Sequence, residues 1–418
     1  MRHPGSPRTR QASRARYSRK TSVDFTLIVV LVIVLALFFD FTNGFHDTAN
    51  AMATPIATGA MRPKIAVALA AVLNLVGAFL STEVAKTISN GLIKEGGGGV
   101  QITPTMILAG LVGAIIWNLV TWLFGLPSSS SHALFGGLIG AAIVGAGFAS
   151  VDYLVLLDKV IFPALLSPVI AGFVAFCSTR LAYAITRRYD RLPDGRAGFR
   201  FAQIFSSSLV ALAHGTNDAQ KTMGVITLVL ISAGALAPGS NPPVLVITAC
   251  ALAIAVGTYT GGWRIIRTLG KGLTDVKPAQ GFAAETSTAA TILASSHLGF
   301  ALSTTQVASG SVIGSGLGRR GSSVRWGTAG RIGLGWLMTL PASAVVGAIA
   351  AFIGLLGVVG VVIDLVVAVG VIVLIFAVSK RNQVSARNAF QGVNEVAESG
   401  RVVKIRKVKP KKARGQAA

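Results

Sequence analysis

Long runs of apolar residues alternate with short polar segments along most of this chain. An α-helix rises about 1.5 Å per residue, so roughly 20 apolar residues cross the hydrocarbon core of a bilayer. Several runs approach that length and predict membrane-spanning helices. The predicted spans are Thr26–Phe39, Ile65–Leu80, Met106–Phe124, Ala164–Ile185, Val244–Gly262, Leu334–Leu356 and Val358–Val378.

Two polar motifs interrupt the apolar sequence, and each occurs twice, in the same order and at nearly the same spacing. The first acidic motif, Gly44–Asn50, is echoed by the second acidic motif, Gly215–Lys221. The first hydroxyl motif, Gly125–His132, is echoed by the second hydroxyl motif, Gly299–Gln306. Both hydroxyl motifs lead into a Gly-x-x-x-Gly step. Duplicated polar breaks within hydrophobic sequence are typical of secondary transporters with a binding site at the membrane midplane.

The hydroxyl motifs lie between apolar arms that are too long for a loop and too interrupted for one continuous helix. We expect each to form the tip of a re-entrant hairpin, because non-helical backbone at membrane depth must pack in protein or line a wet cavity. The predicted fold is therefore an all-α polytopic membrane protein, an inverted-repeat secondary transporter with two re-entrant hairpins and seven full crossings.

Composition agrees with a membrane protein: 52% of the 418 residues are hydrophobic and 13% are charged, and the mean hydropathy is +0.67. The net charge of +23 lies mostly outside the apolar runs, which favours contacts with anionic lipid head groups over nucleic acid. We predict a basic N-terminal tail (1–24), a first transmembrane repeat (25–185), a basic cytoplasmic linker (186–200), a second repeat (201–357), a final helix (358–378) and a basic C-terminal tail (379–418).

The basic segments also predict the orientation. With seven crossings, the linker, two later basic loops and the C-terminal tail fall on one side, which the positive-inside rule makes cytoplasmic. The N-terminal tail, with seven Arg and Lys residues, falls on the other side and disagrees with this arrangement.

The carboxylates of the acidic motifs are costly groups for a membrane interior. An isolated carboxylate at mid-bilayer costs roughly 2.5–3.5 kcal/mol on insertion scales. Asp47 and Asp218 therefore predict a bound cation or proton, and oxygen ligands suit Na⁺ or a divalent metal. Asn50 lies one helical turn after Asp47, and Lys221 takes the matching place after Asp218, where it offsets the carboxylate or meets an anion.

The hydroxyl motifs predict an anion site. If a half-helix begins after each tip, its free N–H groups and positive dipole end face the same point. Two such tips, one from each side, could enclose a small tetrahedral oxyanion. The hydroxyls that would bind it are those of Ser128, Ser129, Ser130, Ser131, Ser303, Thr304 and Thr305.

Other polar residues give weaker signals. His46 and His132 are either proton relays or neutral hydrogen-bonding groups, and Asn217 and Gln306 take their places in the second half. Glu285 is either a cation site or a structural cap. Asn118 and Gln220 are supporting candidates, whereas His214, His297 and the two cysteines, Cys177 and Cys250, are interpreted as structural.

These motifs resemble the inorganic phosphate transporter (Pit) family. The resemblance covers residues 25–378 and rests on Asn43–Ala51, Ile116–Asn118, Gly125–His132 and His214–Ile226. The first acidic motif is most similar to the bacterial low-affinity branch. The resemblance implies a phosphate symporter with inverted repeats, coupled to protons or sodium, whose bacterial members also accept a neutral metal–phosphate complex.

By position, the resemblance assigns family roles to the two aspartates, to Asn50 and to the hydroxyls at both tips. The matching tip residues are Ser129, Ser130, Ser131 and His132 in the first half, and Ser303, Thr304 and Thr305 in the second. The sequence departs from the family at His46, where many members have Asn, and at Ala301, Leu302 and Gln306, where Pro, Val and His are more familiar.

The sequence thus predicts a phosphate transporter that is not an enzyme and works by alternating access, with symport of a proton rather than of Na⁺ as the first choice. The alternatives are a sulfate transporter of the same family, an intramembrane Ser/His hydrolase and a structural or receptor protein. We expect no cofactor apart from the coupling ion. Expected partners are phosphate, with or without a divalent metal, anionic lipids and a second copy of the chain. The expected location is a bacterial inner membrane, with the C-terminal tail cytoplasmic.

Overall fold

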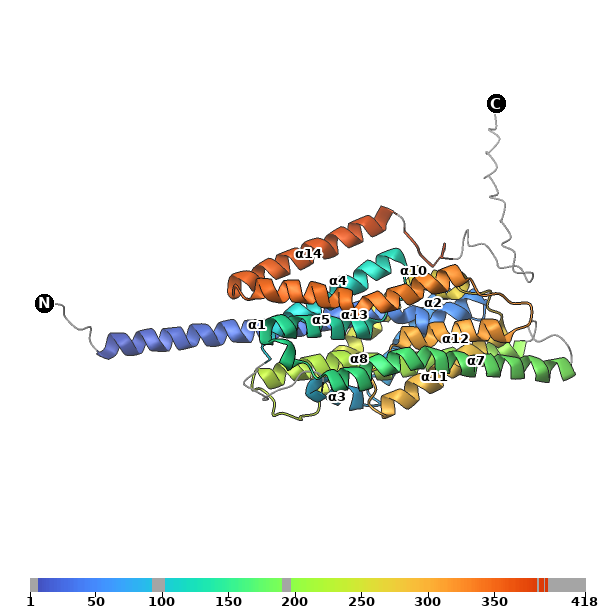
Figure 1. Ribbon diagram of the computed structural model, residues 1–418, viewed down its shortest axis with the longest axis horizontal. Coiled ribbons are helices and arrows are strands. Elements are labelled where there is room, and N and C mark those ends of the chain that lie inside the picture. The colour runs from blue at the N-terminus through green and yellow to red at the C-terminus, as the bar shows by residue number, and fades with distance from the viewer. Residues whose placement is uncertain (1–6, 92–101, 190–196, 382, 387, 390–418) are drawn as a thin grey trace, which may run out of the picture.

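A computed structural model describes residues 7–91, 102–189, 197–381, 383–386 and 388–389. Most helices lie side by side along the long axis of the molecule, and the N-terminal part of α1 projects beyond them (Figure 1). The long helices are α1 (Pro7–Ala57), α2 (Pro63–Gly77), α4 (Pro104–Phe124), α5 (Ser130–Ala146), α7 (Phe162–Tyr189), α8 (Ala197–Ser232), α9 (Val244–Thr260), α11 (Pro278–His297), α12 (Thr304–Gly318), α13 (Trp326–Gly354) and α14 (Val358–Arg381).

Shorter helical segments connect these helices. They are α3 (Glu83–Gly91), η1 (Phe148–Ser150), α6 (Tyr153–Leu156), η2 (Leu157–Ile161), α10 (Trp263–Arg267) and η4 (Thr268–Gly272). Most of the predicted basic C-terminal tail and the centre of the predicted linker 186–200 lie outside the described residues. Within the predicted N-terminal tail, residues from Pro7 onward continue α1.

Five helices of the described chain are long and apolar enough to cross a membrane, and the bent pair Val244–Thr260 with Trp263–Gly272 makes a sixth. The five spans are Thr26–Ala57, Pro104–Phe124, Tyr153–Thr186, Trp326–Gly354 and Val358–Arg381. The protein is therefore a polytopic helical membrane protein. The predicted span Ile65–Leu80 corresponds to α2, whose 15 residues reach about 22 Å, short of a bilayer core of about 30 Å.

Local sequence sets the ends of the helices on both sides of the first hydroxyl motif. The Thr103 side chain accepts a hydrogen bond from Met106 N, with Pro104 at the first helical position, and so starts α4. Gly125 ends α4 in the left-handed conformation, at φ 64°. Ser129 then caps α5 by accepting from His132 N. The helix break at residues 125–129 is therefore encoded by a C-cap glycine followed at once by an N-cap serine.

The two halves of the chain pack their helices through matching contacts. Helix α1 packs on α9, while α8, its counterpart in the second half, packs on α2. Gly44 of α1 approaches the Ile254 carbonyl of α9, and Gly215 of α8 approaches the Asn74 carbonyl of α2 in the same way. An added Cβ would lie 2.3 Å and 2.2 Å from these oxygens. Glycine is required at both positions because the backbones of two helices meet there.

The Gly-x-x-x-Gly steps after the hydroxyl motifs serve the same purpose in both halves. Gly136 and Gly140 on α5 face the carbonyls of Leu340 and Ala344 on α13. Gly310 and Gly314 on α12 face the carbonyls of Pro168 and Gly172 on α7. These close backbone contacts fix the two helices that follow the hydroxyl motifs, and thereby position the residues at their N-terminal ends.

Candidate functional site

The two acidic motifs lie within α1 and α8, and both hydroxyl motifs end at the start of a helix, α5 or α12. The side chains that the sequence singled out in these motifs are buried by the surrounding helices. Thr304 and Thr305 hydrogen-bond to residues of both acidic motifs. Ser130 reaches the first acidic motif as well. The four motifs therefore meet in one place.

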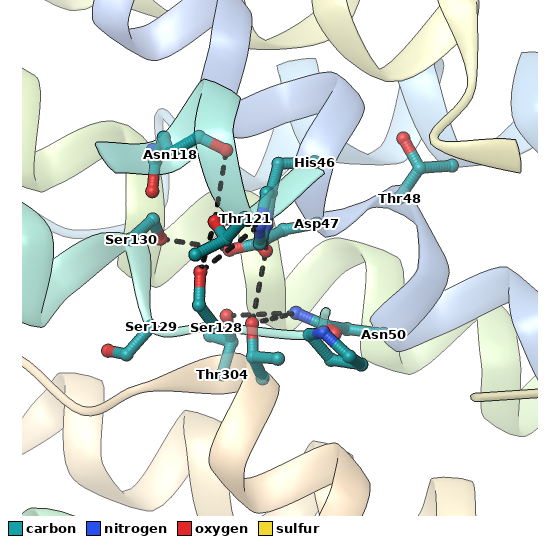
Figure 2. Close-up of polar contacts among 12 residues, drawn as sticks. His46, Asp47, Thr48, Asn50, Asn118, Thr121, Ser128, Ser129, Ser130 and Thr304 are labelled. Atoms are coloured by element: carbon teal, nitrogen blue, oxygen red, sulfur yellow. Dashed lines mark hydrogen bonds and ion pairs between the residues drawn. The ribbon is translucent and has the colours of Figure 1, made fainter. Parts of the chain in front are cut away.

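Asp47 is held by hydroxyl and imidazole side chains from both halves of the chain. Its Oδ1 accepts hydrogen bonds from Thr305 Oγ1 at 3.0 Å and pairs with His46 Nδ1 at 2.5 Å. Its Oδ2 accepts from Ser130 Oγ at 2.9 Å (Figure 2). Ser130 begins α5 and Thr305 is the second residue of α12, so this carboxylate links the N-terminal ends of two helices. Such hydrogen bonds offset part of the cost of burying the charge.

Asp218 is held differently, by a fully buried lysine. Lys221, one turn further along α8, donates through Nζ to Asp218 Oδ1. The same ammonium donates to the Leu302 carbonyl in the second hydroxyl motif, at 3.1 Å. Asp218 Oδ2 accepts from Thr304 Oγ1 at 3.1 Å. The lysine side chain therefore pairs with the second aspartate and also anchors the second hydroxyl motif.

His214 stands between the two aspartates, contrary to its interpretation as a structural residue. Its Nε2 lies 2.8 Å from Asp218 Oδ2 and 3.9 Å from Asp47 Oδ2. Its Nδ1 lies 3.2 Å from Asn74 Oδ1, which orients the ring. Sequence reasoning missed it, although it lies four residues before Asp218, one helical turn away on the same face.

Asp47, His214 and Asp218 each offer one ligand atom, and these atoms lie within 4.8 Å of one another. Carboxylate oxygens and an imidazole nitrogen form a donor set that first-row divalent metals accept, while the carboxylates alone suit Na⁺. With neutral imidazoles, the two aspartates and Lys221 sum to one negative charge. This centre can therefore accept a single positive charge more readily than a bare anion.

The N-terminal ends of α5 and α12 meet next to this centre. Ser303 caps α12 by accepting from Gln306 N at 3.3 Å, as Ser129 does for α5 at 3.1 Å. Ser131 Oγ donates to the Leu302 carbonyl at 3.0 Å and so ties the two hydroxyl motifs together. A helix begins within each hydroxyl motif, at Ser130 and at Thr304, as the prediction of an anion site assumed. Two helix N-termini with hydroxyl side chains form an arrangement that favours an oxyanion.

Asn50 and His46 complete the first half of the site. Asn50 Nδ2 donates to Thr305 Oγ1 at 3.0 Å and lies 3.3 Å from Thr304 Oγ1 (Figure 2). His46 bridges Asp47 to Ser128, whose Oγ lies 3.3 Å from His46 Nε2. Ser128 in turn donates to Thr121 Oγ1 at 2.7 Å. Hydroxyl, imidazole and carboxylate thus form a continuous chain that can pass a proton.

Glu285 lies in a second polar cluster beside the centre. Its Oε1 accepts from Thr54 at 2.5 Å and from Gln203 at 3.1 Å, and its Oε2 accepts from Ser206 at 2.6 Å. A small cavity is lined by both Glu285 and Asn50. Glu285 is therefore not a helix cap: it is a buried carboxylate that borders the same cavity as the central site.

The remaining predicted residues lie near the centre without joining it. Gln220 accepts through Oε1 from Val84 N at 2.8 Å and so fixes the start of α3. Asn217 donates to Ser296 Oγ at 2.9 Å. His132 faces the backbone of Val160. Several buried amide atoms have no partner among the described residues: both of Asn118, and the side-chain oxygens of Asn50, Asn217 and Gln306.

Comparison with known proteins agrees with this arrangement. The phosphate transporter family matches residues 43–197 and 186–347. A Mycobacterium bovis protein named "Probable low-affinity inorganic phosphate transporter" is 58% identical over 322 residues, 77% of this chain and 76% of its own length. A Bacillus subtilis protein of the same name is 44% identical, over 78% of this chain and 97% of its own.

A solved structure has the same fold. The protein titled "The sodium-dependent phosphate transporter" matches with a TM-score of 0.70 and 24% identity, over 79% of this chain and all of its own. The family match spans both acidic and both hydroxyl motifs. On these grounds the chain belongs to the phosphate transporter family.

Proposed function

We propose that this protein carries inorganic phosphate across the bacterial plasma membrane by cation-coupled symport, with a proton as the coupling ion. The family is one of transporters rather than enzymes, and the bacterial relatives compared above carry phosphate in their names. The described chain also holds at least five helices able to cross a membrane. These findings support a multi-pass membrane location and phosphate as the substrate.

One observation supports coupling of phosphate to a cation. The hydroxyls that are best placed to bind phosphate already donate hydrogen bonds to the two aspartates. Ser130 and Thr305 donate to Asp47, and Thr304 donates to Asp218. Phosphate therefore competes with the carboxylates for the same donors. A cation or proton on Asp47 weakens the hold of this carboxylate on the hydroxyls and offsets the repulsion of an incoming anion. Binding of the cation thus favours binding of phosphate, which is the requirement for symport.

We assign the roles accordingly. The hydroxyls of both motifs, Ser128–Ser131 and Ser303–Thr305, bind phosphate with the N-terminal ends of α5 and α12. Asp47 is the main cation or proton acceptor, and Asp218 stays paired with Lys221. Supporting roles in the coupling fall to His46, Asn50, Asn217 and Glu285. If a divalent metal travels with phosphate, Asp47, His214 and Asp218 offer its ligands.

The transport cycle that we propose is alternating access between two inverted repeats. Helices α1 and α8 run in opposite directions where they cross, because Asp40 lies opposite Thr222 whereas Asp47 lies opposite His214. The matching contacts of α5 with α13 and of α12 with α7 also support two equivalent halves. Rocking of one half against the other would open the central site to each side in turn. A cytoplasmic C-terminal tail, contacts of the basic segments with anionic lipids, and a homodimer belong to this proposal.

The sulfate-transporter and hydrolase alternatives receive less support. The bacterial relatives compared above are named for phosphate, and none of those names mentions sulfate. A hydrolase would use the chain of Asp47, His46 and Ser128, which has the order of a catalytic triad. The Ser128 hydroxyl, however, donates its hydrogen to Thr121, and the family is one of transporters.

Uptake of radiolabelled phosphate into proteoliposomes tests the proposal. Purified protein is compared with Asp47→Asn and with Glu83→Gln, a control at an exposed acid, under imposed proton or sodium gradients and with excess unlabelled sulfate. We expect uptake driven by the proton gradient and unaffected by sulfate. Asp47→Asn should lose most of the gradient-driven uptake, because the amide cannot take up the coupling proton.

The outcomes separate the parts of the proposal. No phosphate uptake, or uptake abolished by sulfate, would overturn the substrate. Uptake driven by sodium alone would replace the proton as the coupling ion. Full activity in Asp47→Asn would remove this aspartate from the coupling, whereas loss of activity in Glu83→Gln would point to a general defect.

A further inference from the structure

A third aspartate is buried in α1, two turns before Asp47, outside the four motifs. Asp40 is fully buried. Residues 40, 43–44 and 47 lie on one face of the helix, so Asp40 is displaced from Asp47 by about 10 Å along the helix axis. Neither of its carboxylate oxygens closes a hydrogen bond with any described residue. None of the contacts described above for the central site uses this carboxylate.

Polar side chains surround Asp40, and none of them neutralises it. The Thr222 hydroxyl of α8 faces the carboxylate without a closed hydrogen bond. Asn43, on the same face of α1, is fully buried, and neither of its amide atoms has a described partner. The titratable groups that face Asp40 from the packed helices are Lys221, His214 and Asp218 on α8 and Cys250 on α9.

A buried carboxylate in a membrane helix without partners must be neutralised by something that binds it. A metal ion would need about six oxygen ligands or more, and Thr222 is the side-chain donor that faces Asp40. The buried ammonium of Lys221 would also repel a metal ion. A proton needs no further ligand and converts the carboxylate to a neutral acid.

We propose that Asp40, flanked by Asn43 and Thr222, is a proton-carrying carboxylate placed in series with the central site. A proton from water binds one carboxylate oxygen, the neutral acid forms, and the proton returns to water on the other side of the membrane. This inference rests on the proposed function, and it adds a second carboxylate, in series with Asp47, that the coupling proton must occupy on its way across the membrane.

Lys221 connects Asp40 to the phosphate site. It binds Asp218 and the Leu302 carbonyl of the second hydroxyl motif, and it lies within electrostatic reach of Asp40. A charged Asp40 draws the ammonium toward itself without breaking its pair with Asp218 and so weakens its bond to the Leu302 carbonyl, whereas a protonated Asp40 leaves that bond in place. The protonation state of Asp40 therefore biases the position of Leu302 and of the adjoining hydroxyls. In this way a proton bound two helical turns away favours the arrangement that binds phosphate.

The test separates phosphate exchange from proton-driven accumulation in the same proteoliposomes, with the membrane potential held at zero. Wild type, Asp40→Asn, Asp40→Glu and Asp364→Asn are compared; Asp364 is a buried acid of α14 with one unpartnered oxygen, and serves as the matched control. Exchange uses labelled phosphate outside and unlabelled phosphate inside at equal pH. Accumulation uses a gradient of about one pH unit, which drives about tenfold accumulation per coupled proton, and an internal dye records the proton entry.

We expect Asp40→Asn to keep exchange within about twofold of wild type, because the neutral amide resembles the protonated acid. It should lose about tenfold in accumulation together with the phosphate-dependent proton entry. Asp40→Glu should restore both, and Asp364→Asn should behave as wild type. Proton entry that survives in Asp40→Asn would overturn the inference.

Three further results would also count against it. Loss of exchange in both Asp40 variants, with normal elution on size exclusion, would make the residue structural. Wild-type exchange without any proton entry would overturn this inference alone. Wild type that exchanges no phosphate would overturn the proposed function and this inference together.

Discussion

The two acidic motifs meet the hydroxyl motifs in the same way but neutralise their aspartates differently. In each half the first residue of the following helix donates to the aspartate: Ser130 to Asp47 and Thr304 to Asp218. Beyond this shared bond, Asp47 is held by His46 and Thr305, whereas Asp218 is paired with a buried lysine and lies 2.8 Å from His214 Nε2. The two halves thus share one hydrogen bond to the aspartate but differ in the other groups around it.

This difference indicates a division of labour. Neutral donors can leave Asp47 at the cost of one hydrogen bond each, so a cation can replace them. The ammonium of Lys221 cannot leave Asp218 without exposing two buried charges to a medium of low dielectric constant. The partners of Asp47 in the first half can therefore be exchanged for a cation, whereas the Lys221–Asp218 pair in the second half stays closed.

The largest effect should come from removing the fixed charge in the second half. Lys221→Met leaves the charge of Asp218 buried without its partner, and breaking a buried ion pair in this way costs about 3–5 kcal/mol. We expect a marked drop in thermal stability in detergent and loss of phosphate uptake. The double variant Lys221→Met/Asp218→Asn should recover most of the stability, because no unpaired charge is left. A double variant as unstable as the single one would show that packing, not charge, explains the loss.

We expect a smaller loss of stability, of similar size in both halves, at the close helix contacts that the two halves share. Gly140→Ala and Gly314→Ala place a Cβ 2.0 Å and 1.9 Å from backbone oxygens of α13 and α7. Overpacking of this kind costs about 1–3 kcal/mol, and thermal unfolding of the two variants should show similar losses. Gly370→Ala, where an added Cβ has no neighbour within 4 Å, should leave stability unchanged. Strongly unequal losses at the first two positions would contradict the equivalence of the two packing contacts.

We expect the smallest effect on transport when either of two hydroxyls at equivalent positions is removed. Thr305 donates to the Asp47 carboxylate, while Ser131, at the equivalent position, donates to a backbone carbonyl. A hydrogen bond to a charged group contributes about 1.5–3 kcal/mol against about 0.5–1.5 kcal/mol for a neutral one. Thr305→Val should therefore lower kcat/KM for phosphate about tenfold and Ser131→Ala about threefold. The reverse order would assign the stronger role to the first hydroxyl motif.

Much of the fold could be predicted from the sequence because its signals are local. Apolar runs predicted the long membrane helices, and the hydroxyl motifs indicated a break in the helical backbone, after which helices start at Ser130 and Thr304. The length of α2 could not be predicted in this way, because the apolar run from Ile65 to Leu80 continues past the last turn of the helix. A hydropathy pattern records the apolar character of residues and does not mark where a helix stops.

The site was predicted less completely because its electrostatics depend on which helices face each other. Duplication predicted Asp47, Asp218 and the hydroxyls around them. His214 and Thr121 were missed because each becomes significant only through a partner from another helix: His214 through Asp47, and Thr121 through Ser128 and His46. Asp40 was missed for a similar reason, since the residue opposite it, Thr222, is far away in the sequence.

The closed ion pair of Lys221 and Asp218 also bears on how the protein responds to voltage. Moving one elementary charge across the membrane involves about 2.3 kcal/mol per 100 mV. A lysine and an aspartate that travel together carry no net charge, so the field does no net work on them. In the proposed cycle the membrane potential therefore does work on the cation or proton bound to Asp47 and on the phosphate beside it. The second half of the protein can thus change its exposure without opposing, or being driven by, the membrane potential.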